Sequence, residues 1–578
     1  MDNQRLLLWG ALALVLYANY QAWQQDYSAP ATAAGTAHVA APAPSPATAT
    51  PSAAATLSDS VPALAAPAPA TPAAASPPAG APPTSPRTTA QLEASSGVAS
   101  VVKVRTDVLD LEISTQGGEI LRADLPRYPL KGSPGEPMRL LDASSPESLY
   151  VYQWGLTGGG AAEPNHKALF SAEAPSYALA DGTSELTVPL HWTNGAGLAV
   201  TRTLHFTRGS YAIQLTQRVS NSGAEPWRAR DYEQLQRRWQ PADRSMWDPE
   251  TYSFKGPALW DGHKYQKLDV AKPEAEHLPQ GPVAGGWVAA LQHHFVAAIV
   301  PPADVPYDYT LAVKDREFQV RSAGPVREVA PGATVEFRST LYVGPKLQAQ
   351  LAATGSELER TADYGRLFII AQPLFALLAF VHKWIGNWGF TIIVVTLLIK
   401  LCFYPLAQTS GRSMARMREL APRMKAIQER YKDDREQLGK QMMELYKREK
   451  ANPLAGCLPV LVQMPVFIAF YWVLLESAEM RQAPFVLWVH DLSSRDPYFI
   501  LPAIMCAAMY GQFKLNPAPP DPVQAKVFAF MPIAMSAMMA FLPAGLVLYW
   551  VTNTGLSIAQ QWRINKLVAL EVAQKSRS

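Results

Sequence analysis

The chain has 578 residues, more than one hydrophobic core usually organises, so several domains are expected. Its formal net charge of +3 is too small to indicate a nucleic-acid partner. Apolar residues make up 48% of the chain, but long apolar stretches crowd its beginning and the region after residue 385, whereas the middle alternates apolar and polar residues.

The N-terminal segment pairs a short polar start with one long apolar run. That run extends from Leu6 to Trp23, about 18 residues, which exceeds the usual core of a signal peptide and approaches a bilayer span. We therefore expect an uncleaved transmembrane anchor over residues 1–27. The small residues at 28–34 leave cleavage as the alternative, while the absence of a cysteine after the run argues against a lipoprotein.

Residues 28–97 are dominated by Ala, Pro, Ser and Thr and carry almost no charge. Such a segment buries too little apolar surface to offset its ordering entropy, so its composition predicts a disordered tether. A flexible coil of this length has an r.m.s. reach of roughly 45 Å.

Residues 98–350 show the period-two alternation of half-buried strands. Strands are predicted at 102–106, 109–113, 186–192, 201–205, 211–219, 287–299, 309–313, 317–320 and 334–343. Arg208-Gly-Ser210 joins two of them as a hairpin turn. Regularly spaced strands predict a large antiparallel β-sandwich. No cysteine falls in this region, so no disulfide is expected there; Cys402, Cys457 and Cys506 match no metal or redox spacing and are interpreted as small apolar fillers.

The pattern becomes helical after residue 356. Residues 364–384 are apolar but carry Arg366, Pro373, His382 and Lys383. These interruptions favour an amphipathic helix in the membrane interface over a span, and we assign this helix to residues 357–386. Spans are then predicted at 388–408, 457–479, 498–515, 526–542 and 545–563. With the N-terminal anchor this makes six.

Positive charge in the connecting loops predicts the topology. The loop at 409–452 carries twelve Lys and Arg residues and should be cytoplasmic, whereas the loop at 480–497 has only Arg481 and Arg495. Counting the predicted spans backward and forward from the basic loop predicts that both termini, including a basic tail at 566–578, are cytoplasmic and that the β domain lies outside.

Lys400 is the single charge in the 388–408 span. In one continuous helix it would lie roughly 12 Å from the cytoplasmic end, at an insertion cost of about 2.5–3.5 kcal/mol near mid-span. Its long stem permits snorkelling toward the headgroups. The alternative is a cation that lines a wet cavity between helices.

Other spans also carry polar side chains. Gln463 lies in the 457–479 span, and Asn553, Ser557 and Gln560 recur at helical spacing in the last span. Hydrogen bonding between helices would explain such a stripe. Together with a buried cation, however, the stripe favours a hydrophilic groove.

The cytoplasmic segment 410–452 contains two amphipathic stripes separated by Lys432-Asp-Asp434, which predicts a helical hairpin. Met414, Met417 and Met424 lie on its first stripe. Methionine-rich faces suit adaptable binding, but packing of the two arms on each other explains the same pattern.

No P-loop, nucleophile elbow or metal-ligand spacing is present in the sequence. His293 and His294 lie in a predicted strand and are interpreted as strand residues rather than ligands. Glu476 and Glu479 lie near the outer end of a span, where carboxylates are expected to reach water.

Short motifs in the helical region resemble the signature of the YidC/Oxa1/Alb3 insertase family in its long Gram-negative form. The motifs are Asn387–Phe390, Tyr404–Leu406, Asn452–Pro453, Gly456–Pro459, Gln463–Pro465, Asp491–Leu492, Asp496–Pro497 and Pro543–Tyr549. The resemblance is strongest over residues 386–563 and extends through the β domain, where Thr106–Leu111 and Gly117–Gly118 also match.

This resemblance implies a multi-domain membrane protein, with an α-helical bundle of six spans and a periplasmic antiparallel β-supersandwich of the galactose-mutarotase type. Residues 387–565 would form a five-helix core around a groove open to cytoplasm and lipid. The family's groove cation, usually arginine, corresponds to Lys400, which keeps the charge but not the planar fork. Thr396 and Trp550 match positions that face substrate; Trp550 stands where a tyrosine is common.

The resemblance further implies an insertase and chaperone of the bacterial inner membrane that works without ATP and without a cofactor. Its expected partners are nascent integral membrane proteins, the Sec translocon with its accessory subunits, the ribosome, the signal recognition particle receptor and membrane lipids, with no nucleic-acid substrate. Two other classes stay open: a small-solute transporter with Lys400 in its path, and a sugar-modifying enzyme that acts through the β domain. The first would need paired broken helices, and the second paired acid and base groups in a pocket.

Overall fold

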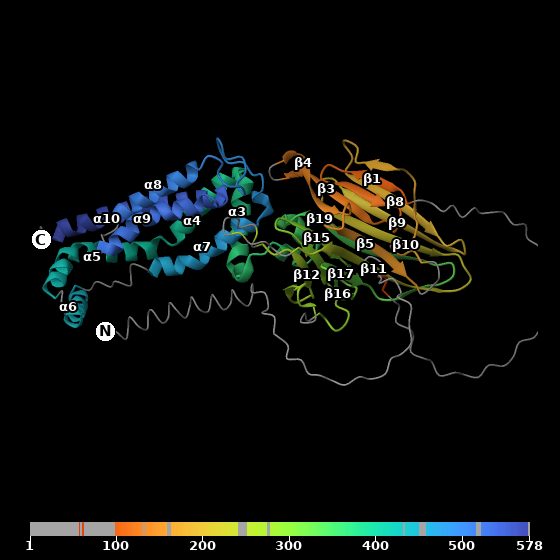
Figure 1. Cartoon of the computed structure of the whole chain (residues 1–578), viewed down its shortest axis with the longest axis horizontal. Coiled ribbons are helices and arrows are strands. Elements are labelled where there is room, and N and C mark those ends of the chain that lie inside the picture. Colours follow the sequence, from red (N-terminus) through yellow and green to blue (C-terminus); the bar gives the residue numbers. More distant parts are fainter. Residues whose placement is uncertain are drawn as a thin grey trace, which may run out of the picture.

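The computed structural model describes residues 99–575, apart from 131–132, 159–162, 241–244, 246–250, 252, 274–277, 432–433, 450–457 and 516–521, and also residues 57 and 60–62. A helical half and a β half lie end to end along the long axis (Figure 1). The predicted anchor lies outside the described residues, as does the predicted tether except for residues 57 and 60–62.

The first sheet of the β domain has ten strands, antiparallel except where β1 pairs with β7. In spatial order they are β16 (Asp308–Lys314), β17 (Glu317–Ala323), β11 (Trp227–Arg238), β5 (Tyr150–Thr157), β4 (Ser133–Asp142), β3 (Ile120–Leu130), β2 (Asp110–Ser114), β1 (Val101–Arg105) and β7 (Ser176–Ala178), with β18 (Arg327–Val329) beside β11.

The second sheet has nine strands. In spatial order they are β13 (Tyr265–Lys267), β12 (Gly256–Trp260), β14 (Trp287–Leu291), β15 (Phe295–Val300), β19 (Thr334–Pro345), β10 (Ala212–Asn221), β9 (Leu198–Thr207), β8 (Glu185–Thr193) and β6 (Ser171–Ala172). Side chains from both sheets share one hydrophobic core. The hydroxyl of Tyr150 in β5 donates to the carbonyl of Ala290 in β14 at 2.8 Å, which ties the two sheets together. The predicted antiparallel sandwich is confirmed.

Strands with one buried face lie close to where alternation predicts them. The 201–205 and 211–219 runs are β9 and β10, which pair across the predicted turn, where Gly209 has φ +75°. β5 is buried along its whole length and therefore shows no alternation, so the pattern missed it. The predicted strand at 287–299 was wrong: it is two strands, β14 and β15, and His293 and His294 lie in the turn between them.

The helical half follows α2 (Gln348–Thr354) and two short 3₁₀ turns, η4 (Leu358–Thr361) and η5 (Gly365–Leu367). Its elements are α3 (Phe368–Ile385), α4 (Trp388–Cys402), α5 (Tyr404–Arg430), α6 (Arg435–Arg448), α7 (Leu458–Glu476), η7 (Ala478–Met480), α8 (Ile500–Leu515), α9 (Pro522–Met539) and α10 (Ala544–Lys575). The last helix continues through most of the segment predicted as a separate basic tail at 566–578.

The predicted straight span at 388–408 was wrong in one respect. α4 ends at Cys402, and the chain bends by 62° before α5. Pro405 lies in the first turn of α5, where its missing N–H is tolerated but where it cannot continue the preceding helix. Lys400 therefore lies in the last turn of α4 rather than eight residues inside a continuous helix.

By length and apolarity, α3 is the one described helix that is long enough to cross a membrane, and the bent pair of α4 with 404–411 is a second when counted as one span. Shorter apolar helices occupy 462–476, 500–515 and 526–539. α3 is the segment predicted to lie in the interface, and Figure 1 places it at the end of the bundle next to the β domain. Its composition fits a span equally well, so the interfacial assignment stays a prediction.

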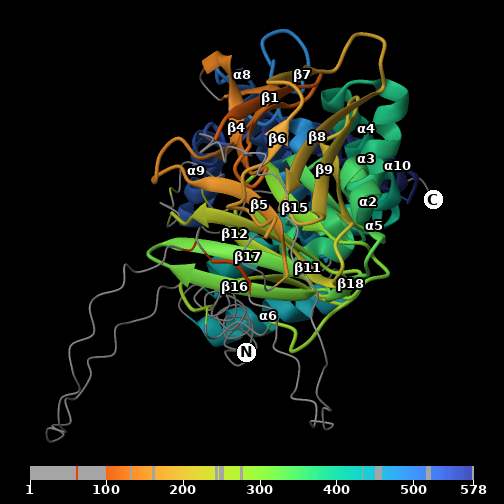
Figure 2. The ribbon, with the colours of Figure 1, turned by 90° about the vertical axis from the view of Figure 1, so that its right-hand side faces the viewer.

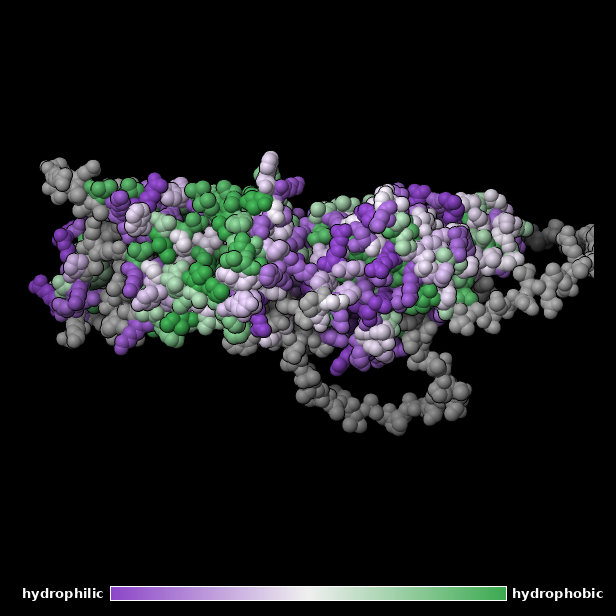
Figure 3. Space-filling model, turned by 90° about the horizontal axis from the view of Figure 1, so that it is seen from above, coloured by the Kyte–Doolittle hydropathy of each residue, from purple (hydrophilic) through white to green (hydrophobic). Residues whose placement is uncertain are grey.

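The two halves differ in surface character. Figure 3 shows hydrophobic residues gathered over the helical half and mainly hydrophilic residues over the β half. Large apolar side chains on α9 and α10 are exposed, among them Phe530 at 62% and Trp562 at 61%. Viewed along the long axis, the β strands stand in front of the bundle (Figure 2). An apolar outer surface of this extent indicates a membrane or partner contact.

Candidate functional site

Lys400 and Ser557 join α4 to α10. The ammonium of Lys400 donates to Ser557 Oγ at 2.7 Å, and that hydroxyl donates to the carbonyl of Asn553 at 2.7 Å. Lys400 is half-buried and makes no ion pair with a carboxylate of any described residue. Its position in the last turn of α4 also puts its charge near the negative end of the helix dipole.

α4 is positioned at its other end by one of the sequence motifs. Asn387 caps the helix, because its side-chain oxygen accepts from the backbone N–H of Phe390 at 3.1 Å. Its amide nitrogen donates to the carbonyl of Phe485 at 3.1 Å, which fixes the cap to the loop after α7. Lys400 is thus held on a helix anchored at its far end.

Three buried donors on α9 and α10 have no hydrogen-bond partner within the described part of the chain. They are Ser536 Oγ, Trp550 Nε1 and Gln560 Nε2. Unsatisfied buried donors are uncommon and costly, so each marks a place where water or a bound chain would be favoured. Gln560 belongs to the predicted polar stripe, whereas Ser536 was missed because it is isolated in an apolar run.

The remaining predicted groove residues are placed differently. Thr396 is 1% exposed, and its hydroxyl donates to the carbonyl of Ile392 in its own helix at 2.6 Å. Gln463 is half-buried near the start of α7. Trp550 packs edge-on against Phe467 at a centroid distance of 4.8 Å. The structure thus brings Lys400 and Ser557 together, and it turns the Thr396 hydroxyl back onto α4.

The predicted hairpin consists of α5 and α6. Leu420 of α5 and Leu445 of α6 are buried together, and Met424 packs against this small cluster. Met424 therefore takes part in the packing of the two arms, while the side chains of Met414 and Met417 lie outside the described residues. Arg423 also joins the arms, through an ion pair with Glu449 at 2.9 Å.

A polar junction that the sequence did not reveal joins the β domain to the end of α7. Ser253 donates to the carboxylate of Glu476 at 2.7 Å, and Nε2 of both His293 and His294 lies about 3 Å from the carbonyl of Leu475. Burial lowers the pKa of His294 to about 3, so this ring is neutral and Nε2 must donate. The interpretation of the two histidines as strand residues was wrong.

Glu479 belongs to the same junction. Its carboxylate accepts from the backbone N–H of Gln348 at 2.9 Å, and burial raises its pKa to about 7. The expectation that Glu476 and Glu479 reach water was wrong, since Glu476 is 1% exposed and one Glu479 oxygen is buried without a partner among the described residues. Nothing in the sequence links these residues to positions more than a hundred residues earlier.

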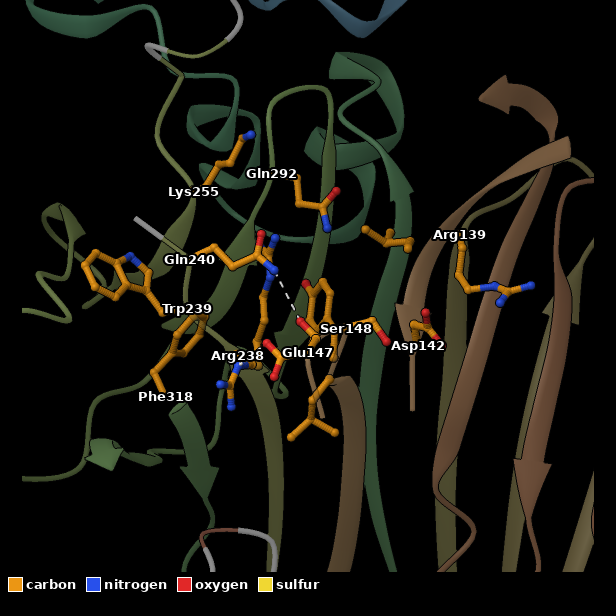
Figure 4. A pocket seen from close by; sticks show the side chains of 14 residues that line it. Arg139, Asp142, Glu147, Ser148, Arg238, Trp239, Gln240, Lys255, Gln292 and Phe318 are labelled. Carbon is orange, nitrogen blue, oxygen red and sulfur yellow. Dashed lines mark hydrogen bonds and ion pairs between the residues drawn. The ribbon is translucent and has the colours of Figure 1, made fainter. Parts of the chain in front are cut away.

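A cavity of about 450 Å³ lies in the β domain (Figure 4). Its carboxylates do not form a general acid and base pair. Glu147 is ion-paired with Arg238 at 3.2 Å. Burial acts to raise the pKa of Asp142, but hydrogen bonds from Ser144 and Ser148 and the charge of Arg139 leave it below its ordinary value. The arrangement gives no support to the sugar-modifying alternative.

Two family models cover the described domains. The model of the 60Kd inner membrane protein matches residues 380–571, and that of the YidC periplasmic domain matches residues 101–377. The membrane protein insertase YidC of Thioalkalivibrio sulfidiphilus is 43% identical, over 98% of each chain. That of Nitrosococcus oceani is 41% identical, over 99% of this chain and all of its own.

Among solved structures, an active YidC insertase with its first transmembrane domain resolved has a TM-score of 0.36 and 16% identity, covering 80% of this chain and 94% of its own. A putative aldose 1-epimerase of Escherichia coli has a TM-score of 0.25 and 12% identity, covering 43% of this chain and 99% of its own. The β domain gains no activity from so remote a similarity. The full-length relatives and both family models show that the chain belongs to the YidC family of membrane protein insertases, bacterial inner membrane proteins with a periplasmic domain.

Proposed function

We propose that the chain inserts and assembles integral membrane proteins in the bacterial inner membrane, alone or beside the Sec translocon, and acts there as a chaperone. The relatives are named for membrane protein insertion and match almost the whole chain. Insertion needs a path by which a short polar segment crosses an apolar layer. The contact between Lys400 and Ser557 is the observation that best supports such a path in this chain.

Six spans would carry this path. They are the N-terminal anchor, α4 with the first turns of α5, α7, α8, α9 and α10, while α3 lies in the interface. The exposed apolar side chains of the bundle support a lipid-facing surface. The many Lys and Arg residues of the loop between α4 and α7 support a cytoplasmic hairpin, with both termini on the same side.

A hydrophilic groove between α4 and α10 would lower the cost of moving a polar segment. Lys400 supplies a positive charge, and the buried donors of Trp550 and Gln560 on α10 favour polar contents. In a partly dehydrated groove, attraction between an ammonium and an acidic segment exceeds its strength in bulk water. Burial of the client's own apolar span in lipid would then drive its release.

The partners follow from this role. Nascent integral membrane proteins are the clients, the Sec translocon and its accessory subunits share them, and lipids receive them. The basic surface of the hairpin suits a ribosome or the signal recognition particle receptor at the cytoplasmic side. No cofactor or nucleic-acid substrate enters the proposal.

Replacing Lys400 tests the groove. Insertion into proteoliposomes is measured for small membrane proteins whose translocated segments are acidic or neutral. Lys400→Arg should be tolerated because the charge survives. Lys400→Ala should slow acidic clients by roughly tenfold, equivalent to about 1.4 kcal/mol, and Lys400→Glu should be slower still because it adds repulsion.

Lys514 offers a matched control, since it also lies in the last turn of an apolar helix, α8. Lys514→Ala should insert both clients at the parent rate. If Lys400→Glu inserts every acidic client as fast as the parent, Lys400 only reaches toward the headgroups and the groove does not use its charge.

A further inference from the structure

One short piece of the Ala/Pro-rich region lies against the β domain. Ser60 Oγ donates to Gln319 Oε1 at 3.0 Å, and Gln319 Nε2 donates to the carbonyl of Leu57 at 3.0 Å. Arg321 Nη2 donates to both the carbonyl and the hydroxyl of Ser60, each at 2.8 Å. Gln319 and Arg321 both belong to β17, so adjacent outward residues of one strand hold two points of the segment.

Beneath this contact runs a row of hydrogen-bonded polar side chains across three strands and the turn before β3. Arg321 Nε donates to Gln234 at 2.8 Å, Gln234 donates to Gln153 at 2.6 Å, and Gln153 donates to Glu119 at 2.6 Å. The strand register makes Arg321, Gln234 and Gln153 direct neighbours on β17, β11 and β5. We name these residues together with Gln319 the polar row.

The polar row lies on the face turned away from the sandwich core, because Leu235, Tyr152 and Val320, the alternate residues of the same strands, belong to that core. Side chains on an outward face of a sheet are normally exposed to solvent. Gln234, Gln153 and Gln319 are nevertheless at most 3% exposed. Buried amides of this kind need both a cover and hydrogen-bond partners.

The contacts specify the chemistry of the ligand. Two backbone carbonyls accept from side-chain donors, and one hydroxyl is engaged by both Gln319 and Arg321. An arginine fork held in place by Gln234 presents fixed donors with little entropy left to lose. A polypeptide that bears a serine or threonine offers carbonyls and a hydroxyl at such a spacing.

We propose that the polar row is a peptide-binding site of the β domain and that the described residues of this segment, 57 and 60–62, are its resident ligand, bound in cis. Tethering to the same chain gives this ligand a high effective concentration, so it keeps other polypeptides out until it is released. Capture at Leu57 would also shorten the predicted tether between the anchor and the β domain, from a reach of roughly 45 Å to roughly 30 Å. The inference does not depend on the proposed insertion function.

The test uses the full chain in detergent and a fluorescently labelled peptide of residues 55–64, followed by fluorescence anisotropy. A chain that lacks residues 55–64 should bind the peptide at least tenfold more tightly than the parent chain, in which the site is already filled. Adding Arg321→Ala to the shortened chain should weaken binding about tenfold. Arg338→Ala, which removes an exposed arginine paired with Glu336, should leave it unchanged. A peptide with Ser60→Ala should also bind more weakly.

Hydrogen exchange on the unmodified chain tests the contact without any variant, so a misfolded variant cannot affect the result. The amides of Leu57, Ser60 and Val61 should exchange more slowly than those at 66–97, a stretch of similar composition. Equal exchange in the two stretches would overturn the cis contact. Failure of the shortened chain to bind, or equal binding after Arg321→Ala, would overturn the site itself.

Discussion

In the β domain the large apolar side chains lie between two sheets, whereas in the helical bundle many of them lie on the outer surface. Val101 and Val326 are among the few exposed large aliphatic residues of the β domain, at 43% and 39%, while Trp384 and Phe530 of the bundle reach 82% and 62%. Polar contacts occur in both halves: Lys400 and Ser557 of the bundle are half-buried and hydrogen-bonded to each other, and the glutamines of the polar row in the β domain are buried. The apolar outer surface of the bundle suits contact with lipid, and the junction at Glu476 joins this bundle to the β domain.

A charged side chain introduced on the surface of each half should produce the largest difference between the two halves. Phe530→Arg puts a guanidinium on the exposed apolar face of α9, where a lipid environment costs about 2.5–3.5 kcal/mol near mid-span. We expect much less full-length protein in the membrane fraction. Val326→Arg changes an exposed residue of the β domain and should shift the free energy of unfolding by no more than about 0.5 kcal/mol.

Membrane extraction, followed by thermal unfolding of the purified protein, measures both variants. Equal yields of the two would contradict a lipid-facing α9. In that case the exposed apolar face would have to be covered by protein instead.

Substitution of Glu479 at the junction should have an intermediate effect on stability, and this effect should depend on pH. Glu479 has an ordinary pKa of 4.5, and burial raises it to about 7. Its stabilising contribution is therefore complete below pH 4.5 and is lost as pH rises through 7, because only the unfolded chain ionises readily in between. Glu479→Gln should relieve this loss and stabilise the junction at pH 8 relative to the parent, by roughly 1–3 kcal/mol.

The two histidines of the junction titrate in the opposite sense to Glu479. Burial lowers the pKa of His293 and His294, so their contribution is lost as pH falls below 6.5. Lys346, Glu476 and Arg481 are present in the parent and in the variant alike, so their own titration occurs in both. The difference in melting temperature between parent and Glu479→Gln, measured from pH 5 to pH 8, therefore isolates Glu479. Glu185→Gln, at an exposed site on β8, serves as the control, and a difference that does not change with pH would refute the assignment.

Strands could be predicted from the sequence where one of their faces meets water and the other is buried. Alternation predicted β9 and β10 because each has one wet face, and it failed for β5, which is buried on both. The polar residue types around Lys400 predicted a hydrophilic groove, which stays a prediction; the structure shows one contact within that set, from Lys400 to Ser557. The bend after Cys402 was missed although Pro405 marks it. Ser253 and the two histidines were out of reach, because their partners on α7 lie about two hundred residues away and no local pattern records a tertiary contact.

The smallest expected effect concerns the hairpin, where packing and client binding compete to explain the methionines. Met424 packs on Leu420 and Leu445, so Met424→Ser should loosen the hairpin by about 1 kcal/mol, less than for a fully buried methionine. Insertion and the protease resistance of the hairpin should then fall together.

Met414→Ser with Met417→Ser should slow insertion at an unchanged protein level if these residues meet the incoming chain. Met443→Ser, at a 37% exposed position on α6, is the control. If the Met414 and Met417 double variant loses protein level and insertion in proportion, the whole stripe serves only to pack the two arms, and the hairpin would contribute its basic surface alone.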